Sequence, residues 1–184
     1  GNVRTFLLEN NLISNDITII DEKFYSSSNK NVYRYTYITH NMTKYINIIE
    51  FKPFEFVINF DQNNLSSIID DNVVNSSRNN VDYKFEVIES TENSIRYKLS
   101  ITNNSNDSYQ FDFSNLNSLQ ILSNEKYANM ALVANSSDSE FILNYGDSRS
   151  IEVLFNISLE DQMSVTAFKF NNVIINGSNS SVEI

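Results

Sequence analysis

The sequence predicts an all-β protein built from antiparallel β-sandwiches. Apolar and polar residues alternate along many short segments, which is the period of a half-buried strand. Clusters of Asn, Ser and Asp separate these segments at regular intervals, as turns do in sandwiches and barrels. The 184 residues include 13 Phe and 10 Tyr, too many aromatic residues for a disordered chain. These observations together favour short strands that bury an aromatic core.

Four segments in the first third of the chain have the strand pattern. The clearest is residues 31–39, where β-branched and aromatic residues predominate and the three tyrosines share one face. Pro53 lies near a boundary between two segments, where its missing N–H is tolerated. The expected strands are residues 16–21, 31–39, 45–51 and 54–60.

Residues 62–80 differ in character, because Asn, Ser and Asp predominate there. The spacing of the few apolar residues is compatible with one short amphipathic helix. We interpret the segment as a linker or a long connection, with a domain boundary near residues 78–81. The expected domains are an N-terminal β-sandwich-like module over 1–78 and a C-terminal sandwich over 79–184. The apolar residues of the segment are Leu65, Ile68, Ile69, Val73 and Val74.

Strand patterns resume after this segment, with turn clusters between them. Most Asn residues fall in these clusters, where their tolerance of left-handed backbone and their side-chain turns are useful. The Asn content, about thirty residues, is therefore compatible with an all-β fold. The expected strands are 81–89, 94–102, 109–113, 116–122, 141–144, 149–157 and 165–175.

Residues 31–43 and 94–106 form a candidate internal repeat. Each segment is a period-two strand with Ile-Thr near its end and an Asn two residues after the Thr, and an aromatic strand follows each. His40 takes the place of Asn103, which predicts a turn residue at position 40. The repeat favours two related sandwich modules in tandem. The alternative is a chance likeness between two hairpins of an Asn-rich chain.

The second half resembles the immunoglobulin-like sandwich domains of exported Firmicutes lipoproteins, known as DUF4352-type domains. Two motifs carry the resemblance: Ser100-Ile101-Thr102-Asn103-Asn104-Ser105 at a strand end, and Asn144-Tyr145-Gly146-Asp147-Ser148 in a turn before a strand. Tyr145 stands where that family usually has Pro. Gly146 supplies the positive φ that the turn requires. The resemblance covers residues 81–184 and, weakly, 12–60, and it implies an exported, non-catalytic immunoglobulin-like module without catalytic residues.

Composition excludes several kinds of chemistry. The chain has no Cys, one His and three Gly, so thiol chemistry, His-rich zinc sites and Gly-rich phosphate loops are ruled out. A net charge of -10 disfavours nucleic acid and anionic membranes as partners. The sequence contains no apolar run long enough to span a membrane. Its Cys-free, Asn- and Ser-rich composition suits an extracellular or cell-surface bacterial protein, with a possible lipid anchor upstream of Gly1.

The pairs of adjacent carboxylates do not predict an acid/base catalytic site. Asp70-Asp71 and Glu160-Asp161 are adjacent pairs, and adjacent residues of a strand point to opposite faces. We therefore expect no enzyme activity and no cofactor. Calcium is a weak alternative, because carboxylates near loops supply the oxygen ligands that it prefers. The candidate calcium ligands are Asp107, Asp112, Asp138, Glu140 and Asp147.

Tyr33, Tyr35 and Tyr37 are the candidate ligand-binding residues. They share one face of a strand, where rings could stack on sugars or contact a protein. The alternative is packing beneath neighbouring elements of the core. The sequence as a whole predicts a non-catalytic surface module that binds a protein or a carbohydrate. The other function considered is an assembly subunit that pairs through edge strands.

Overall fold

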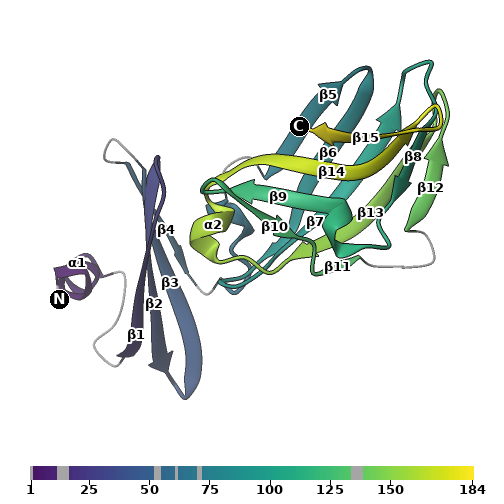
Figure 1. The fold of residues 1–184 in the computed structure, drawn as a ribbon. Coiled ribbons are helices and arrows are strands. Elements are labelled where there is room, and N and C mark those ends of the chain that lie inside the picture. Colours follow the sequence, from purple (N-terminus) through teal and green to yellow (C-terminus); the bar gives the residue numbers. More distant parts are fainter. Residues whose placement is uncertain (1, 12–16, 52–54, 61, 70–71, 134–138) are drawn as a thin grey trace. The chain divides into compact units, whose positions relative to one another are not determined.

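The computed structural model describes residues 2–11, 17–51, 55–60, 62–69, 72–133 and 139–184. The chain forms two compact units, Gly1–Asn63 and Asn64–Ile184. Antiparallel sheets dominate both units (Figure 1), which confirms the all-β prediction. Two short α-helices, α1 (Asn2–Glu9) and α2 (Leu159–Gln162), accompany the sheets.

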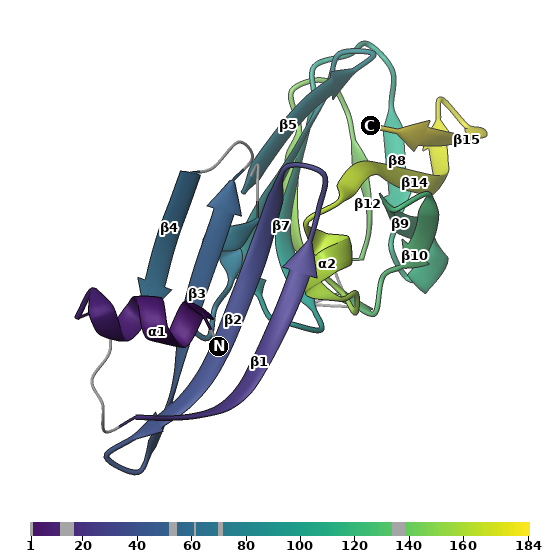
Figure 2. The same ribbon diagram turned by 90° about the vertical axis from the view of Figure 1, so that its left-hand side faces the viewer.

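The N-terminal unit contains a four-stranded antiparallel meander. Its strands follow one another in space as they do in the sequence: β1 (Thr18–Ser26), β2 (Lys30–Thr39), β3 (Met42–Phe51) and β4 (Glu55–Phe60). The helix α1 lies across one face of this sheet (Figure 2). Leu7 of α1 packs into a buried cluster with residues of the sheet, so the helix supplies the cover that a single sheet needs.

The C-terminal unit contains two sheets. One has the order β11-β13-β7-β6-β5, and the other has the order β10-β9-β14-β8-β12, with β15 also paired to β14. The strands of the first sheet are β5 (Val73–Arg78), β6 (Val81–Ser90), β7 (Ile95–Asn103), β11 (Leu132–Val133) and β13 (Ser148–Phe155). The strands of the second sheet are β8 (Tyr109–Asp112), β9 (Leu119–Ser123), β10 (Lys126–Asn129), β12 (Glu140–Leu143), β14 (Val165–Ile175) and β15 (Ser178–Glu183).

Aromatic side chains join these two sheets into a sandwich. Phe85 of β6 stacks on Phe168 of β14, with ring centroids 3.7 Å apart and planes at 9°. Tyr97 of β7 meets Phe168 edge-on at 5.4 Å. Phe85, Tyr97 and Phe168 are all buried. Ring contacts of this kind contribute about 0.5–1.5 kcal/mol each beyond the area that they bury.

The segment interpreted as a linker belongs to the sandwich. Residues 66–68 form a 3₁₀ turn, η1 (Ser66–Ile68), and Val73 and Val74 lie in β5, not in a helix. β5 pairs with β6 along its whole length, from Val73 opposite Glu86 to Arg78 opposite Val81. The division between compact units therefore falls after Asn63, not at the expected 78/79, because a cut there would separate the strands of one hairpin.

The interpretation of two related sandwich modules in tandem is not confirmed. The described part of the N-terminal unit has one sheet under a helix, where a sandwich would have two facing sheets. β2 and β3 form a hairpin within that sheet. β7 and β8, their supposed counterparts, lie in different sheets of the C-terminal unit. Within the described residues, the likeness between residues 31–43 and 94–106 is thus a likeness of strand pattern.

Asn residues occupy two-residue hairpin turns, as the sequence predicts. In each such turn both central residues have positive φ, the geometry that matches the twist of the flanking strands. Left-handed backbone is tolerated by Asn and Gly better than by other residues. His40, expected at a turn, occupies one of these positions with φ 49°. The turns are His40-Asn41, Asn79-Asn80, Asn124-Glu125 and Asn176-Gly177.

Candidate functional site

The tyrosine face predicted as a ligand-binding surface is core. Tyr35 and Tyr37 are only 3% and 7% exposed, and both belong to the cluster that Leu7 of α1 completes. The Tyr35 hydroxyl donates to Glu22 Oε1 at 3.1 Å. Burial and this hydrogen bond raise the pKa of Tyr35 to about 12. Tyr33 is partly buried against the same cluster, and its ring lies 5.1 Å from that of Phe24. This geometry supports the packing alternative.

The acidic side chains considered for calcium act as hydrogen-bond acceptors in turns and strands. Asp107 accepts from Asn176, Asp112 from the Ser114 N–H, Asp147 from the Asn144 N–H and Glu140 from Gln110. Asp138 lies outside the described residues. Within the part of the chain that the structure describes, no group of three or more His, Asp or Glu residues could hold a metal ion.

The adjacent carboxylate pairs bring no acid/base site together. Asp70 and Asp71 lie outside the described residues. Glu160 and Asp161 lie in the first turn of α2, where acidic residues suit the positive end of a helix. Asp161 also accepts a 2.7 Å hydrogen bond from the Asn124 amide. Both residues therefore have structural roles that the sequence did not reveal.

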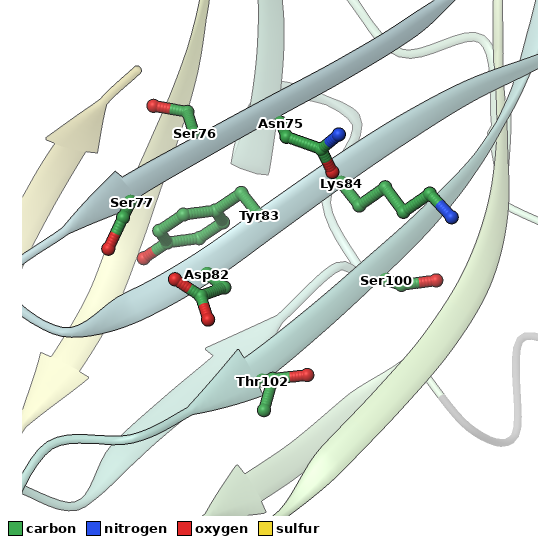
Figure 3. Close-up of a pocket in the computed structure, with 8 residues that line it drawn as sticks. All are labelled: Asn75, Ser76, Ser77, Asp82, Tyr83, Lys84, Ser100 and Thr102. Atoms are coloured by element: carbon green, nitrogen blue, oxygen red, sulfur yellow. The ribbon is translucent and has the colours of Figure 1, made fainter.

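A shallow polar hollow on the C-terminal sandwich is the site that the structure favours. Its lining residues come from β5, β6 and β7 (Figure 3). Its volume is about 500 Å³. We call it the polar trough. Its lining residues bear hydroxyl, amide or charged groups and come from three adjacent strands. They are Asn75, Ser76, Ser77, Asp82, Tyr83, Lys84, Ser100 and Thr102.

Strand register arranges these side chains in rows. Ser77 is opposite Asp82, and Asp82 is opposite Thr102 on the next strand. In the neighbouring row, Asn75 is opposite Lys84, and Lys84 is opposite Ser100. Directly opposed residues share a face of a sheet, so each row points in one direction. Tyr83 alternates with these residues along β6, and its ring is buried among the core aromatics.

Hydroxyl pairs extend the rows to β13. Ser100 and Ser150 lie with their hydroxyl oxygens 2.8 Å apart, and so do Thr102 and Ser148. A hydroxyl both donates and accepts, so each pair keeps capacity for a further hydrogen bond to a ligand. The four residues are at least partly exposed. The trough thus presents adaptable hydrogen-bonding groups on a regular sheet surface.

The charged groups in and beside the trough already have partners. Lys84 Nζ lies 2.7 Å from Glu86 Oε1, and this contact lowers the pKa of Glu86. Asp82 accepts a 2.9 Å hydrogen bond from the Asn104 amide. A highly charged ligand would have to compete with these contacts, whereas a neutral ligand would leave them intact. The geometry therefore suits a neutral, hydroxyl-bearing molecule.

One buried group in the lining has an unmet hydrogen bond. The Tyr83 side chain is 1% exposed, and its hydroxyl finds no hydrogen-bond partner within the described residues. Burial raises the pKa of Tyr83, because a tyrosinate would lose its hydration there. Sequence reasoning missed the trough because its residues, taken singly, are ordinary polar residues of strands. Only the register between β5, β6 and β7 brings them together.

Tyr127 is a second feature that the sequence did not single out. It lies on β10, is 45% exposed, and donates a 2.8 Å hydrogen bond to Glu183 Oε1. The Lys169 Nζ lies 5.4 Å from the centre of its ring. These contacts fix an exposed ring on the other sheet of the sandwich. Glu183 is more than fifty positions from Tyr127 in the sequence, so no local pattern around Tyr127 indicates this contact.

Another hollow, of about 560 Å³, involves β5, β14 and β15. Arg78 and Glu183 supply its charges, and Glu183 already accepts from Tyr127. Its lining lacks the hydroxyl pairs that distinguish the polar trough, so we consider it the weaker candidate.

Comparison with protein-family models, curated proteins and solved structures finds no match to this chain. Within the described residues, none of the helices is long and apolar enough to cross a membrane.

Proposed function

We propose that the protein is a non-catalytic binding module whose polar trough holds a neutral glycan. The observation that carries the proposal is the pair of register-matched rows of hydroxyl, amide and charged groups across β5, β6 and β7. Glycan hydroxyls donate and accept hydrogen bonds, as do the side chains of Ser100 and Thr102. Asp82 and Lys84, which lie in the same rows, add an acceptor and a donor to these hydroxyls.

The spacing of carboxylates supports binding over hydrolysis. Asp82 and Glu86 are four residues apart on β6, which corresponds to about 13 Å along a strand at about 3.3 Å per residue. Glycosidases that use two carboxylates hold them about 5–10 Å apart. Glu86 is also engaged by Lys84. These two groups are therefore poorly placed for acid/base work on one glycosidic bond.

A titration of the ¹⁵N-labelled full chain with neutral oligosaccharides, monitored by NMR, tests the proposal. We expect amide shifts at the trough and an affinity about fivefold lower in Thr102→Val, since a net hydrogen bond contributes about 1 kcal/mol. Thr166→Val on β14 is the matched control, and it should bind as the unaltered chain does. Loss of binding in Tyr127→Ala but not in Thr102→Val would move the site to the other sheet. Absence of any shift with the whole panel would overturn the proposal.

We place this module on the bacterial cell surface or outside the cell. Support comes from the Cys-free, acidic composition and from the resemblance of residues 81–184 to domains of exported lipoproteins. The first codons of the native gene test this placement. An export signal, with or without a lipid-modified Cys, is the expected finding, and a start codon directly before residue 1 would contradict it.

A further inference from the structure

We propose that β4 pairs with β4 of a second copy of this chain and joins two N-terminal sheets into one. β4 lies at the end of the strand order β1-β2-β3-β4, so within the described residues it pairs on one side only. The backbone groups on its other side are a template for an incoming strand. This inference concerns the N-terminal unit and is independent of the polar trough.

The composition of β4 leaves this edge unprotected. Its six residues are Glu-Phe-Val-Ile-Asn-Phe, with one charge and no Pro. Phe56, Val57 and Phe60 are 58%, 45% and 40% exposed, and by strand alternation Val57 lies on the face opposite to the two Phe residues. An exposed apolar edge strand of this kind is prone to pair with another strand.

The opposite edge of the same sheet is protected. β1 carries three consecutive charged residues, Asp21, Glu22 and Lys23. Its pairing with β2 is also interrupted by a bulge between Ile19 and Asp21. Charges and bulges are the devices that discourage edge-to-edge association. The contrast within one sheet indicates that β4 is the edge available for pairing.

The sequence of β4 is complementary to itself in one antiparallel register. A two-fold axis through Val57 places Val57 opposite its own copy, Phe56 opposite Ile58, and Glu55 opposite Asn59. Apolar residues then face apolar residues, and the one carboxylate of the strand faces an uncharged amide and not a second carboxylate. The alternative axis through Ile58 would oppose Val57 to Asn59, an apolar side chain to an amide. Such self-complementarity is what a symmetric dimer requires and identifies the occupant as a second copy.

The absence of Cys from the chain makes a disulfide test possible. In Val57→Cys the two thiols would face each other across the axis, where opposed Cβ atoms lie about 4.5–5.5 Å apart. In Phe56→Cys the two thiols would be diagonal neighbours at about 7–8 Å, too far for a disulfide. Ile20→Cys is the control, because Ile20 lies on β1, at the opposite edge of the sheet, and is also exposed. Its rate of disulfide formation measures random collision between chains.

Under mild oxidation, Val57→Cys should form a linked dimer at least about ten times faster than Ile20→Cys, because pairing raises the effective thiol concentration. In sedimentation equilibrium the unaltered chain should dimerise, and Val57→Lys should be monomeric with an unchanged circular dichroism spectrum. Equal cross-linking rates at positions 57 and 20, together with a monomeric unaltered chain, would overturn the proposal. Faster linkage in Phe56→Cys than in Val57→Cys would overturn the Val57-centred pairing.

Discussion

The carbonyl oxygen of Asn103 accepts a 2.6 Å hydrogen bond from the backbone N–H of Gly146. The Asn103 N–H in turn donates to the carbonyl of Asp147 at 2.9 Å. The buried Asn103 amide donates to the carbonyls of Asp107 and Leu143, and its oxygen accepts twice from Ser105. One side chain thus ties the end of β7 to the turns that follow β7 and β12.

Asn103→Ala should destabilise the sandwich by about 2–4 kcal/mol, because it leaves several buried backbone groups without partners. Urea unfolding at neutral pH measures this loss. Asn104→Ala is the neighbouring control and should cost less than about 1 kcal/mol, since the exposed Asn104 amide makes a single surface contact with Asp82. Equal effects at positions 103 and 104 would contradict the bonding role of Asn103.

Gly146→Ala should lower the free energy of unfolding by about 1–2 kcal/mol, and the positive φ at this position should be the whole cause. Gly146 has φ +85°, and a Cβ added there would meet no atom within 4 Å. Gly177, with φ +81° and equally open surroundings, should show a similar cost on conversion to Ala. Urea unfolding of both variants checks this. A cost above about 4 kcal/mol at one position only would show that backbone strain is not the cause.

Tyr83→Phe should stabilise the sandwich by about 1 kcal/mol. The hydroxyl of Tyr83 is buried with no partner within the described residues, and such a group costs about 1–3 kcal/mol. Tyr127→Phe, which removes an exposed hydroxyl bonded to Glu183, should not stabilise. Thermal unfolding compares the two variants. A destabilised Tyr83→Phe variant would indicate that the hydroxyl has a partner, such as ordered water.

Stability should fall as the pH rises from about 10 to about 12. Burial and the contact with Glu22 raise the pKa of Tyr35 from 10.0 to about 12, so the folded chain keeps a proton that the unfolded chain releases. Fewer protons on the unfolded chain mean that the free energy of unfolding decreases through this window and is unaffected below it. Urea midpoints measured across this range test the prediction. In Tyr35→Phe the urea midpoint should depend less on pH in this range. An unchanged pH dependence in that variant would show that other groups cause it.

Strand alternation predicted β2, β6, β7 and β14 well, because each is long enough to show its period. β10 and β11 have four and two residues, too few for a pattern. β15 is Ser-rich and owes its conformation to pairing with β14 after the Asn176-Gly177 turn. Its strand character is thus set by tertiary contacts, not by local preference.

The candidate site was harder to predict than the strands. Alternation correctly placed Tyr33, Tyr35 and Tyr37 on one face, but it carries no information on what covers that face. The face is covered by α1, whose Leu7 lies nearly thirty positions earlier in the sequence and packs in the same buried cluster. The polar trough required the pairing of Lys84 with Ser100 across strands, which composition does not specify.

The division after Asn63 determines where a fragment that contains only the C-terminal sandwich should begin. A fragment starting at residue 79 would lack β5 and leave β6 as a bare edge, which invites aggregation. A fragment of residues 64–184 retains every sheet partner that the described structure gives to its strands. Its first residue is anchored as well, since Asn64 Oδ1 accepts from the backbone N–H groups of Ser66 and Ser90. Recombinant work on the sandwich should begin at or before this asparagine.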